Sequence, residues 1–229
     1  MAIHLDHFSI SSPNLLYGAH RLRLESTLSF YDGGHFLNGD HANRIFPLGA
    51  NTYLELGGIV NAQSVADPKT RPWWYKRAVA VNSPIFSGLC LRVSTMEELA
   101  EVARRHGGTI RTNTRTPPDG PPVMFWEAPH ARAGADPWES GKPTWCCWQD
   151  RLYMHPSGQP VVNAPGLVQP RGVAWLEMGG TKAQMQQWLG QNPDDLKLKF
   201  NGKSPGLYAI GVTTDIGDVE IRRPSATGV

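Results

Sequence analysis

One pattern of secondary structure recurs three times along the chain and limits the folds that the chain can adopt. Each copy reads as a strand, a helix and then three strands, and the copies follow one another at a spacing of ~85 residues. Repeated units of this kind predict an α+β fold of curved mixed sheets with helices packed outside. The predicted segments are a first module at 1–56, a connection at 57–86, a second module at 87–150, a linker at 151–171, a third, degenerate module at 172–223 and a tail at 224–229.

Each predicted helix begins at a capping residue. Asn14 precedes apolar residues at near-helical spacing, so its side chain is expected to accept a hydrogen bond from the first turn. Ser94 with Glu97, and Thr181 with Gln184, have the spacing of a capping box, in which two side chains satisfy backbone amides reciprocally. The same start signal therefore supports the helix of each copy.

Two strands of the first module carry polar residues at positions that need an explanation. On the strand at 3–10, alternation places His7 on one face and Asp6 and Phe8 on the other. On the strand that ends at residue 56, Glu55 shares a face with Tyr53, opposite two leucines. A carboxylate in an apolar strand is costly to bury without a partner. The candidates for that partner are His7, His35 and His41.

Composition excludes several classes of function. The chain has 229 residues, 40% hydrophobic and 18% charged, which is ordinary for a globular protein, and its net charge of +2 has no basic run that would indicate nucleic-acid binding. The three cysteines lack the spacing of a secreted disulfide scaffold. With no signal peptide and no window near ~18 uninterrupted apolar residues, we expect a cytoplasmic protein that binds no membrane. The expected partner is a small molecule, and a homodimer is left open.

A series of motifs between about residues 3 and 156 occurs in the same order in a known superfamily. They are Leu5-Asp6-His7, Pro13-Asn14-Leu15, Gly33-Gly34-His35, Gly39-Asp40-His41-Ala42-Asn43-Arg44, Tyr53-Leu54-Glu55-Leu56, Arg71-Pro72-Trp73-Trp74, the stretch 114–120, Trp126 and His155-Pro156. In these motifs the chain resembles the glyoxalase-like proteins of the vicinal oxygen chelate superfamily. The resemblance implies paired β-α-β-β-β modules whose curved mixed sheets surround a central pocket.

The resemblance also implies a metal site. In the superfamily, a histidine on the first strand and a glutamate on the last strand of each module hold a divalent metal, and His7 and Glu55 match those positions in the first module. The second module offers Leu89, Cys147 and Gln149 instead. Two alternatives follow: a three-ligand site of His7, Glu55 and His41 or His35, holding Zn, Fe, Mn or Ni, or a metal-free pair in which His7 and Glu55 act as acid and base. No nucleotide cofactor is expected.

Further residues are candidates for substrate binding. His41, a catalytic candidate together with His7 and Glu55, shares a strand face with Asn43 by period two. Arg115, before a tight turn, has the planar cation that binds a carboxylate or a phosphate. The tryptophans are candidates for an aromatic wall, although core packing is the more common role of any single tryptophan. The predicted substrate-binding residues are His35, Asn43, Tyr53, Trp74, Arg115, Trp126 and His155.

Two functions fit this sequence. The first is an enzyme of the lyase, isomerase or dioxygenase class that acts on a small oxygenated molecule, and the retained His7 and Glu55 favour it. The second is a non-catalytic protein of the same fold that binds or sequesters a small molecule and confers resistance. The missing metal ligands of the second module favour this alternative.

Overall fold

The computed structural model describes residues 1–35, 41–69, 71–116, 122–128, 137–158 and 167–228. One sheet contains β1 (His4–Ser12), β2 (Tyr31–His35), β3 (His41–Gly49), β4 (Thr52–Ile59), β5 (Ile85–Val93), β6 (Arg111–Arg115), β7 (Val123–Glu127) and β8 (Thr144–Cys147). A second sheet contains β9 (Pro170–Gly179), β10 (Leu198–Phe200), β11 (Gly206–Thr214) and β12 (Gly217–Arg222). The α-helices are α1 (Leu15–Ser26), α2 (Tyr75–Ala80), α3 (Met96–His106) and α4 (Lys182–Leu189). Short 3₁₀ turns are η1 (Ala62–Val65), η2 (Gln149–Met154), η3 (Pro156–Gly158) and η4 (Asp194–Leu196).

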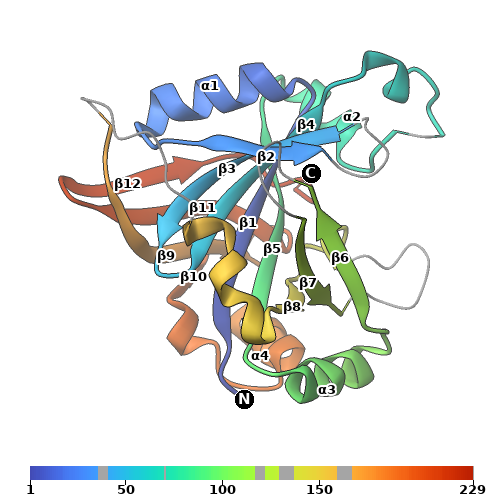
Figure 1. Cartoon of the computed structure of the whole chain (residues 1–229), viewed down its shortest axis with the longest axis vertical. Helices are drawn as coiled ribbons and strands as arrows, with labels where there is room; N and C mark the ends of the chain where they lie inside the picture. The colour runs from blue at the N-terminus through green and yellow to red at the C-terminus, as the bar shows by residue number, and fades with distance from the viewer. Residues whose placement is uncertain (36–40, 70, 117–121, 129–136, 159–166, 229) are drawn as a thin grey trace.

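The first sheet is built from two halves with the same internal arrangement (Figure 1). Its strand order is β2-β3-β4-β1-β5-β8-β7-β6. β1 runs parallel to β4, β5 runs parallel to β8, and the halves join through the antiparallel pair β1/β5. The two outer edges approach each other, because His35 at the end of β2 forms a bridge with Thr116 just beyond β6. The sheet therefore curls around an enclosed space, as the predicted α+β class with curved mixed sheets requires.

The second sheet has the same order of elements along the chain but a different order in space. Its strands lie in the order β10-β9-β11-β12, with β10 parallel and β11 antiparallel to β9. β9 also contacts β3, and β11 contacts β5, so this sheet packs against the first. At one contact, a Cβ on Gly49 would lie 3.1 Å from the backbone of Arg171, which favours glycine there.

The main core lies on the convex side of the first sheet. Phe8, Leu54 and Leu91 contribute from its strands, and Ile210 and Leu176 from the second sheet belong to the same buried cluster. Helices α1, α3 and α4 add the apolar residues Leu15, Leu22, Leu99, Val102, Met185 and Leu189. One continuous core therefore joins both sheets, and Phe125 and Trp148 belong to a separate, smaller cluster.

Two of the three predicted helix starts are confirmed at the predicted residue. Asn14 accepts a hydrogen bond from the amide of Tyr17, and Thr181 forms a capping box with Gln184. The capping box of α3 uses Thr95 and Glu98, one residue later than the predicted pair at 94 and 97. β5 extends to Val93, and Thr95 still has extended backbone, so the helix begins at the next residue.

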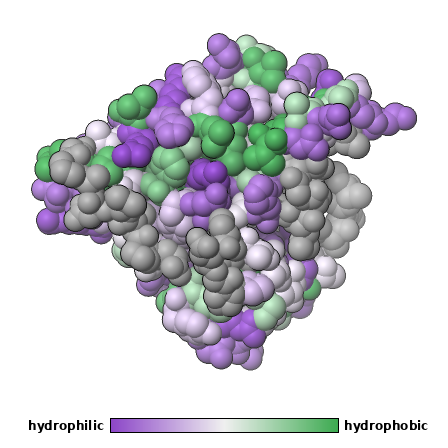
Figure 2. Space-filling view, turned by 45° about the horizontal axis from the view of Figure 1, so that its top comes forward, coloured by the Kyte–Doolittle hydropathy of each residue, from purple (hydrophilic) through white to green (hydrophobic). Residues whose placement is uncertain are grey.

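The surface is mixed in character. Figure 2 shows a short band of hydrophobic residues near the upper middle of the displayed face, with hydrophilic residues on both sides. Large exposed apolar side chains on α1 are Leu16, Tyr17 and Leu24. In the described part of the chain, no helix has the length and apolar character needed to cross a membrane.

Candidate functional site

The concave face of the first sheet encloses a cavity of about 660 Å³, a size suited to a small molecule. Strands from both halves of the sheet contribute to its wall. The polar lining residues include His7, Ser9, Ser11, His41, Asn43, Glu55, Ser87, Asn113, Arg111 and Glu127. The aromatic lining residues are Tyr53, Trp74, Phe125, Trp138 and Trp148. The cavity thus combines an apolar body with a limited set of polar groups.

The register of β1 and β4 brings His7 and Glu55 to the same wall. His7 lies opposite Tyr53, and Ser9 lies opposite Glu55 in this parallel pair. Side chains two residues apart share a face of the sheet, so His7 and Glu55 are diagonal neighbours there. The predicted pair therefore lines one cavity.

A β-bulge adds Asp6 to the site. Leu5 pairs with Leu91 and His7 with Cys90, so Asp6 is the extra residue on β1. The expected alternation, with Asp6 on the face opposite His7, therefore fails at this point. The ring nitrogen Nδ1 of His7 lies 2.8 Å from Oδ1 of Asp6, and Asp6 is fully buried. This contact leaves Nε2 as the nitrogen of His7 that remains for a ligand.

The second oxygen of Asp6 has several donors. Its Oδ2 accepts hydrogen bonds from Trp148 Nε1 at 2.9 Å, from Arg92 Nη1 at 3.3 Å and from His155 Nε2 at 3.3 Å. Burial opposes ionisation of Asp6, but the hydrogen bonds from His155 and His7 outweigh it and hold the pKa of Asp6 well below its ordinary value. Asp6 is therefore a charged carboxylate at neutral pH.

His155 supports this network as a neutral imidazole. The amide of Ser157 donates to its Nδ1 at 3.2 Å, so the proton of the neutral ring is on Nε2 and points to Asp6. Burial lowers the pKa of His155, in agreement with a neutral ring. His155 is 1% exposed and does not line the cavity.

His7 is the positively charged partner of Asp6. Burial opposes its protonation, but its interactions with Cys90, Asp6 and Glu55 outweigh that cost and raise the pKa of His7 to about 10. The ring of Tyr53 stacks on His7 with centroids 4.9 Å apart, which fixes the orientation of the imidazole. At neutral pH, His7 thus offers an N–H donor to the cavity.

Glu55 is positioned from the neighbouring strand. Nδ2 of Asn43 donates to Oε1 of Glu55 at 2.8 Å. A Cβ on Gly33 would lie 2.0 Å from Oδ1 of Asn43, so a glycine at 33 makes room for this amide. Asn43 Oδ1 and Ser9 Oγ are buried without a hydrogen-bond partner among the described residues. Buried polar atoms of this kind call for a polar ligand or water beside them.

The donor set does not reproduce the metal site that the resemblance implies. Among the described residues, His7, Glu55 and His41 do not form a group with donor atoms mutually within 4.8 Å, whereas Asp6, Cys90 and Cys146 do. The oxygens of Asp6 are already occupied, and burial raises the pKa of Cys146 well above its ordinary value. Leu89 and Cys147 lie in the core, and Gln149 is exposed. A divalent metal therefore stays a prediction.

The structure separates the predicted site residues into two sets. His7, His41, Asn43, Tyr53, Glu55 and Trp74 line the cavity. His35 is exposed, so His41 is the cavity member of the two histidines. Trp126 lies under Arg151 on the face opposite Phe125, which takes the cavity position because side chains alternate. Arg115 ends β6, and its side chain lies outside the described residues.

Sequence reasoning missed several residues of the site, among them Asp6, Ser9 and Trp138. Asp6 has the right chemistry, but only the bulge turns it toward His7. Ser9 follows His7 by two and shares its face, so period two was sufficient to find it. Trp138 packs against Gly88 and donates to the carbonyl of Leu89, and no local pattern in the sequence signals that contact.

Comparisons with known proteins agree with this architecture. A family model described as a glyoxalase-like domain matches residues 5–191. A hypothetical protein from Staphylococcus aureus superposes with a TM-score of 0.54 at 11% identity, covering 96% of this chain and 85% of that chain. Comparison with curated proteins gives no match.

Two epimerase structures are also similar, at lower scores. Methylmalonyl-CoA epimerase from Mycobacterium tuberculosis has a TM-score of 0.40 at 14% identity, covering 63% of this chain and 85% of that chain. The Streptomyces coelicolor enzyme in complex with 2-nitronate-propionyl-CoA has a TM-score of 0.41 at 12% identity, covering 63% and 96%. Because the family model matches most of the sequence, the chain belongs to the family of glyoxalase-like domain proteins.

Proposed function

We propose that this protein is an enzyme that moves a proton at a carbon next to a carbonyl group, in an isomerase or lyase reaction on a small oxygenated molecule. The observation that carries the proposal is the pairing of His7 with Asp6 on the same concave wall as Glu55. A cation and a carboxylate then face one substrate from neighbouring strands. This is the arrangement that general acid–base catalysis requires.

The chemistry assigns one role to each residue. The carboxylate of Glu55 removes the proton from carbon, and the electron pair of the C–H bond moves toward the carbonyl. The N–H at Nε2 of His7 donates to the carbonyl oxygen as negative charge develops there, and Asp6 keeps the ring charged and oriented. Return of the proton from Glu55 to the former carbonyl carbon of the enediol gives an isomer, whereas loss of a leaving group from the neighbouring carbon gives a lyase product.

The rest of the cavity indicates the kind of substrate. Trp74, Trp138 and Trp148 provide an apolar wall. Ser9 Oγ and Asn43 Oδ1, which have no partner among the described residues, can bond to hydroxyl or carbonyl groups of a substrate. The proposed substrate is therefore a compact molecule with an apolar part and adjacent oxygen atoms.

A binding protein of the same fold remains the second candidate. In the register of the second half, Cys90, which lies opposite His7, pairs with Thr144. The second half thus contributes no carboxylate from β5 or β8 to the cavity wall. In this alternative the cavity holds the ligand without converting it.

The test is exchange of hydrogen for deuterium, followed by proton NMR in D₂O. A panel of 2-oxo acids, 3-oxo acids and hydroxyketones would be incubated with wild-type protein and with Glu55→Gln. We expect wild type to accelerate exchange for at least one compound, and Glu55→Gln to lose on the order of 100-fold or more of that rate, because a general base acts mainly in the transition state. Ligand affinity should change much less.

The control is Glu97→Gln, because Glu97 is an exposed glutamate on α3 outside the cavity. Its exchange rate should equal that of wild type. Wild-type exchange by Glu55→Gln would contradict the catalytic role of Glu55. Binding of panel compounds with equal affinity to both proteins, without exchange, would support the sequestering alternative.

A further inference from the structure

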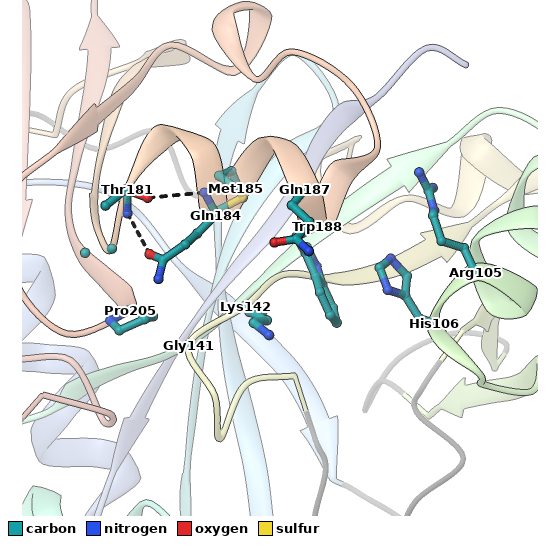
Figure 3. Close-up of a pocket in the computed structure, with 12 residues that line it drawn as sticks. Arg105, His106, Gly141, Lys142, Thr181, Gln184, Met185, Gln187, Trp188 and Pro205 are labelled. Atoms are coloured by element: carbon teal, nitrogen blue, oxygen red, sulfur yellow. Dashed lines mark hydrogen bonds between the residues drawn. The ribbon is translucent and has the colours of Figure 1, made fainter.

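A second cavity, of about 430 Å³, lies away from the concave site (Figure 3). It is formed where the end of α3, the segment before β8 and helix α4 meet. In Figure 3, Arg105 and His106 lie at one end, Lys142 and Trp188 in the middle, and Thr181 and Pro205 at the other end. It shares no lining residue with the concave site.

The charged side chains that line this second cavity are positive. Arg105 and Lys142 line it, and none of its described lining residues is acidic. Neither cation forms an ion pair within the described part of the chain, whereas Arg104, next to Arg105, is paired with Glu101 at 2.7 Å. Two unpaired cations around one cavity give a positive potential that attracts an anion.

Arg105 has donors without acceptors. Its Nη1 donates to the carbonyl of Leu189 at 2.7 Å, which holds the guanidinium at the end of α4. Its Nε and Nη2 are buried and have no hydrogen-bond partner among the described residues. The guanidinium carbon also lies 6.0 Å from the centre of the Trp145 ring, and the charge of this partly buried cation adds to the positive potential of the cavity.

Lys142 is held close to the same cavity by an aromatic platform. Its Nζ lies 4.7 Å from the centre of the Trp188 ring. Trp188 is itself fixed, because its Nε1 donates to the carbonyl of Pro143 at 3.0 Å and its ring stacks on His106 with centroids 4.0 Å apart. The ammonium is thus near the cavity before any ligand arrives, which reduces the cost of ordering it.

The remaining wall is suited to an apolar group. Met185, Trp188 and Pro205 line the cavity beside the two cations. We propose that this cavity is a second binding site, for a small organic anion with its carboxylate beside Lys142, in the positive potential to which Arg105 contributes, and an apolar body against Met185, Trp188 and Pro205. The site is separate from the proposed reaction of the concave cavity and does not depend on it.

The experiment is a titration of ¹⁵N-labelled protein with benzoate at low ionic strength, followed at the indole N–H signals. The Trp188 signal is identified by its loss in Trp188→Phe, and the signals of Trp138 and Trp148 report on the concave cavity. We expect saturable movement of the Trp188 signal, weakened by added salt. Benzamide, which has the same ring without the charge, should bind about tenfold more weakly or not at all.

The matched variants are Lys142→Met and Lys199→Met. Lys199 also lies over an indole, 4.1 Å from the ring centre of Trp175, but outside the cavity. Lys142→Met should weaken benzoate binding by about fivefold to tenfold, since a charge-assisted contact is lost, and Lys199→Met should leave it unchanged. Arg105→Met should also weaken it, with the fold checked in the same spectra.

Several results would overturn the proposal. The first is a Trp188 signal that does not move at any benzoate concentration, and the second is movement confined to the signals of Trp138 and Trp148. The others are benzamide binding as tightly as benzoate, and equal benzoate affinities of Lys142→Met and Lys199→Met. Because Glu55 is absent from this cavity, Glu55→Gln should bind benzoate at Trp188 like wild type. Failure of the proposed enzyme activity is therefore distinguishable from failure of this site.

Discussion

At the scale of single residues, Asp6 contributes most to the order of the site. It is fully buried and receives hydrogen bonds from four side chains that come from β1, from β5 and from the two ends of η2. A buried charge is tolerated only with such partners, and removal of one partner leaves the others uncompensated. Asp6 thus couples the orientation of His7 to the fold itself.

Asp6→Asn keeps the size of the side chain and removes its charge. We expect it to lower the free energy of unfolding by roughly 3–5 kcal/mol at pH 7, because Arg92 and the charged His7 then lack their shared counter-charge. Urea denaturation of wild type and variant measures this difference. Asp150→Asn, at an exposed aspartate in η2, should change stability by less than ~0.5 kcal/mol.

The stabilisation by Asp6 has a defined pH dependence. Its pKa is lower in the folded state than in the unfolded chain, so the unfolded chain binds the proton first as pH falls. The difference between wild type and Asp6→Asn should therefore shrink by up to ~1.4 kcal/mol per pH unit below about pH 4. It should also shrink as the pH rises above about 6.5, because the stabilisation from charged His7 is lost as the pH approaches its raised pKa. A difference that grows on acidification below about pH 4 would contradict the assignment to Asp6.

At the scale of elements, the short-range sequence patterns predict the helix caps and the alternation of strand side chains. They do not predict the register between strands. Capping signals place all three long helices to within one residue, since a cap depends on side chains only three positions apart. Period two places Glu55 and His7 on the cavity wall. The bulge at Asp6 depends on pairing with β5, more than eighty positions away, so no local pattern reveals it.

Thr95→Ala tests the cap of α3. Thr95 accepts from the amide of Glu98 at 3.2 Å, and Glu98 returns the bond to the amides of Ser94 and Thr95. Removal of the hydroxyl should lower the free energy of unfolding by ~1 kcal/mol. Ser94→Ala is the matched control, at an exposed neighbour, and should have little effect. An equal loss of stability in both variants would contradict the assignment of Thr95 as the capping residue.

At the scale of the whole molecule, the two sheets share one core. Residues of the second sheet, such as Ile210 and Leu176, belong to the same buried cluster as Phe8 and Leu54 of the first. The repeated strand–helix pattern predicts the elements of each unit, but the packing of one sheet on another depends on contacts that period alone does not specify. The different strand order of the second sheet is an example.

Ile210→Ala tests that shared core. Ile210 is 0% exposed, and its truncation should lower the free energy of unfolding by roughly 2–5 kcal/mol while both sheets still unfold in one transition. Coincident curves by tryptophan fluorescence and circular dichroism check this. Ile216→Ala, at a residue 79% exposed, is the matched control and should be nearly neutral. Two separate transitions would show that the sheets are energetically independent.

The charge of His7 tests the central claim most directly, because the proposed chemistry needs an N–H donor beside Glu55 at neutral pH. The measurement is a pH titration of the imidazole nitrogens of His7 by ¹⁵N NMR, in wild type and in Asp6→Asn. We expect the wild-type pKa of His7 to be raised to about 10, and the variant to titrate at a clearly lower pH, because the Asp6 contact favours the charged ring. A wild-type His7 that titrates near or below 6.5, or at the same pH in both proteins, would contradict the account.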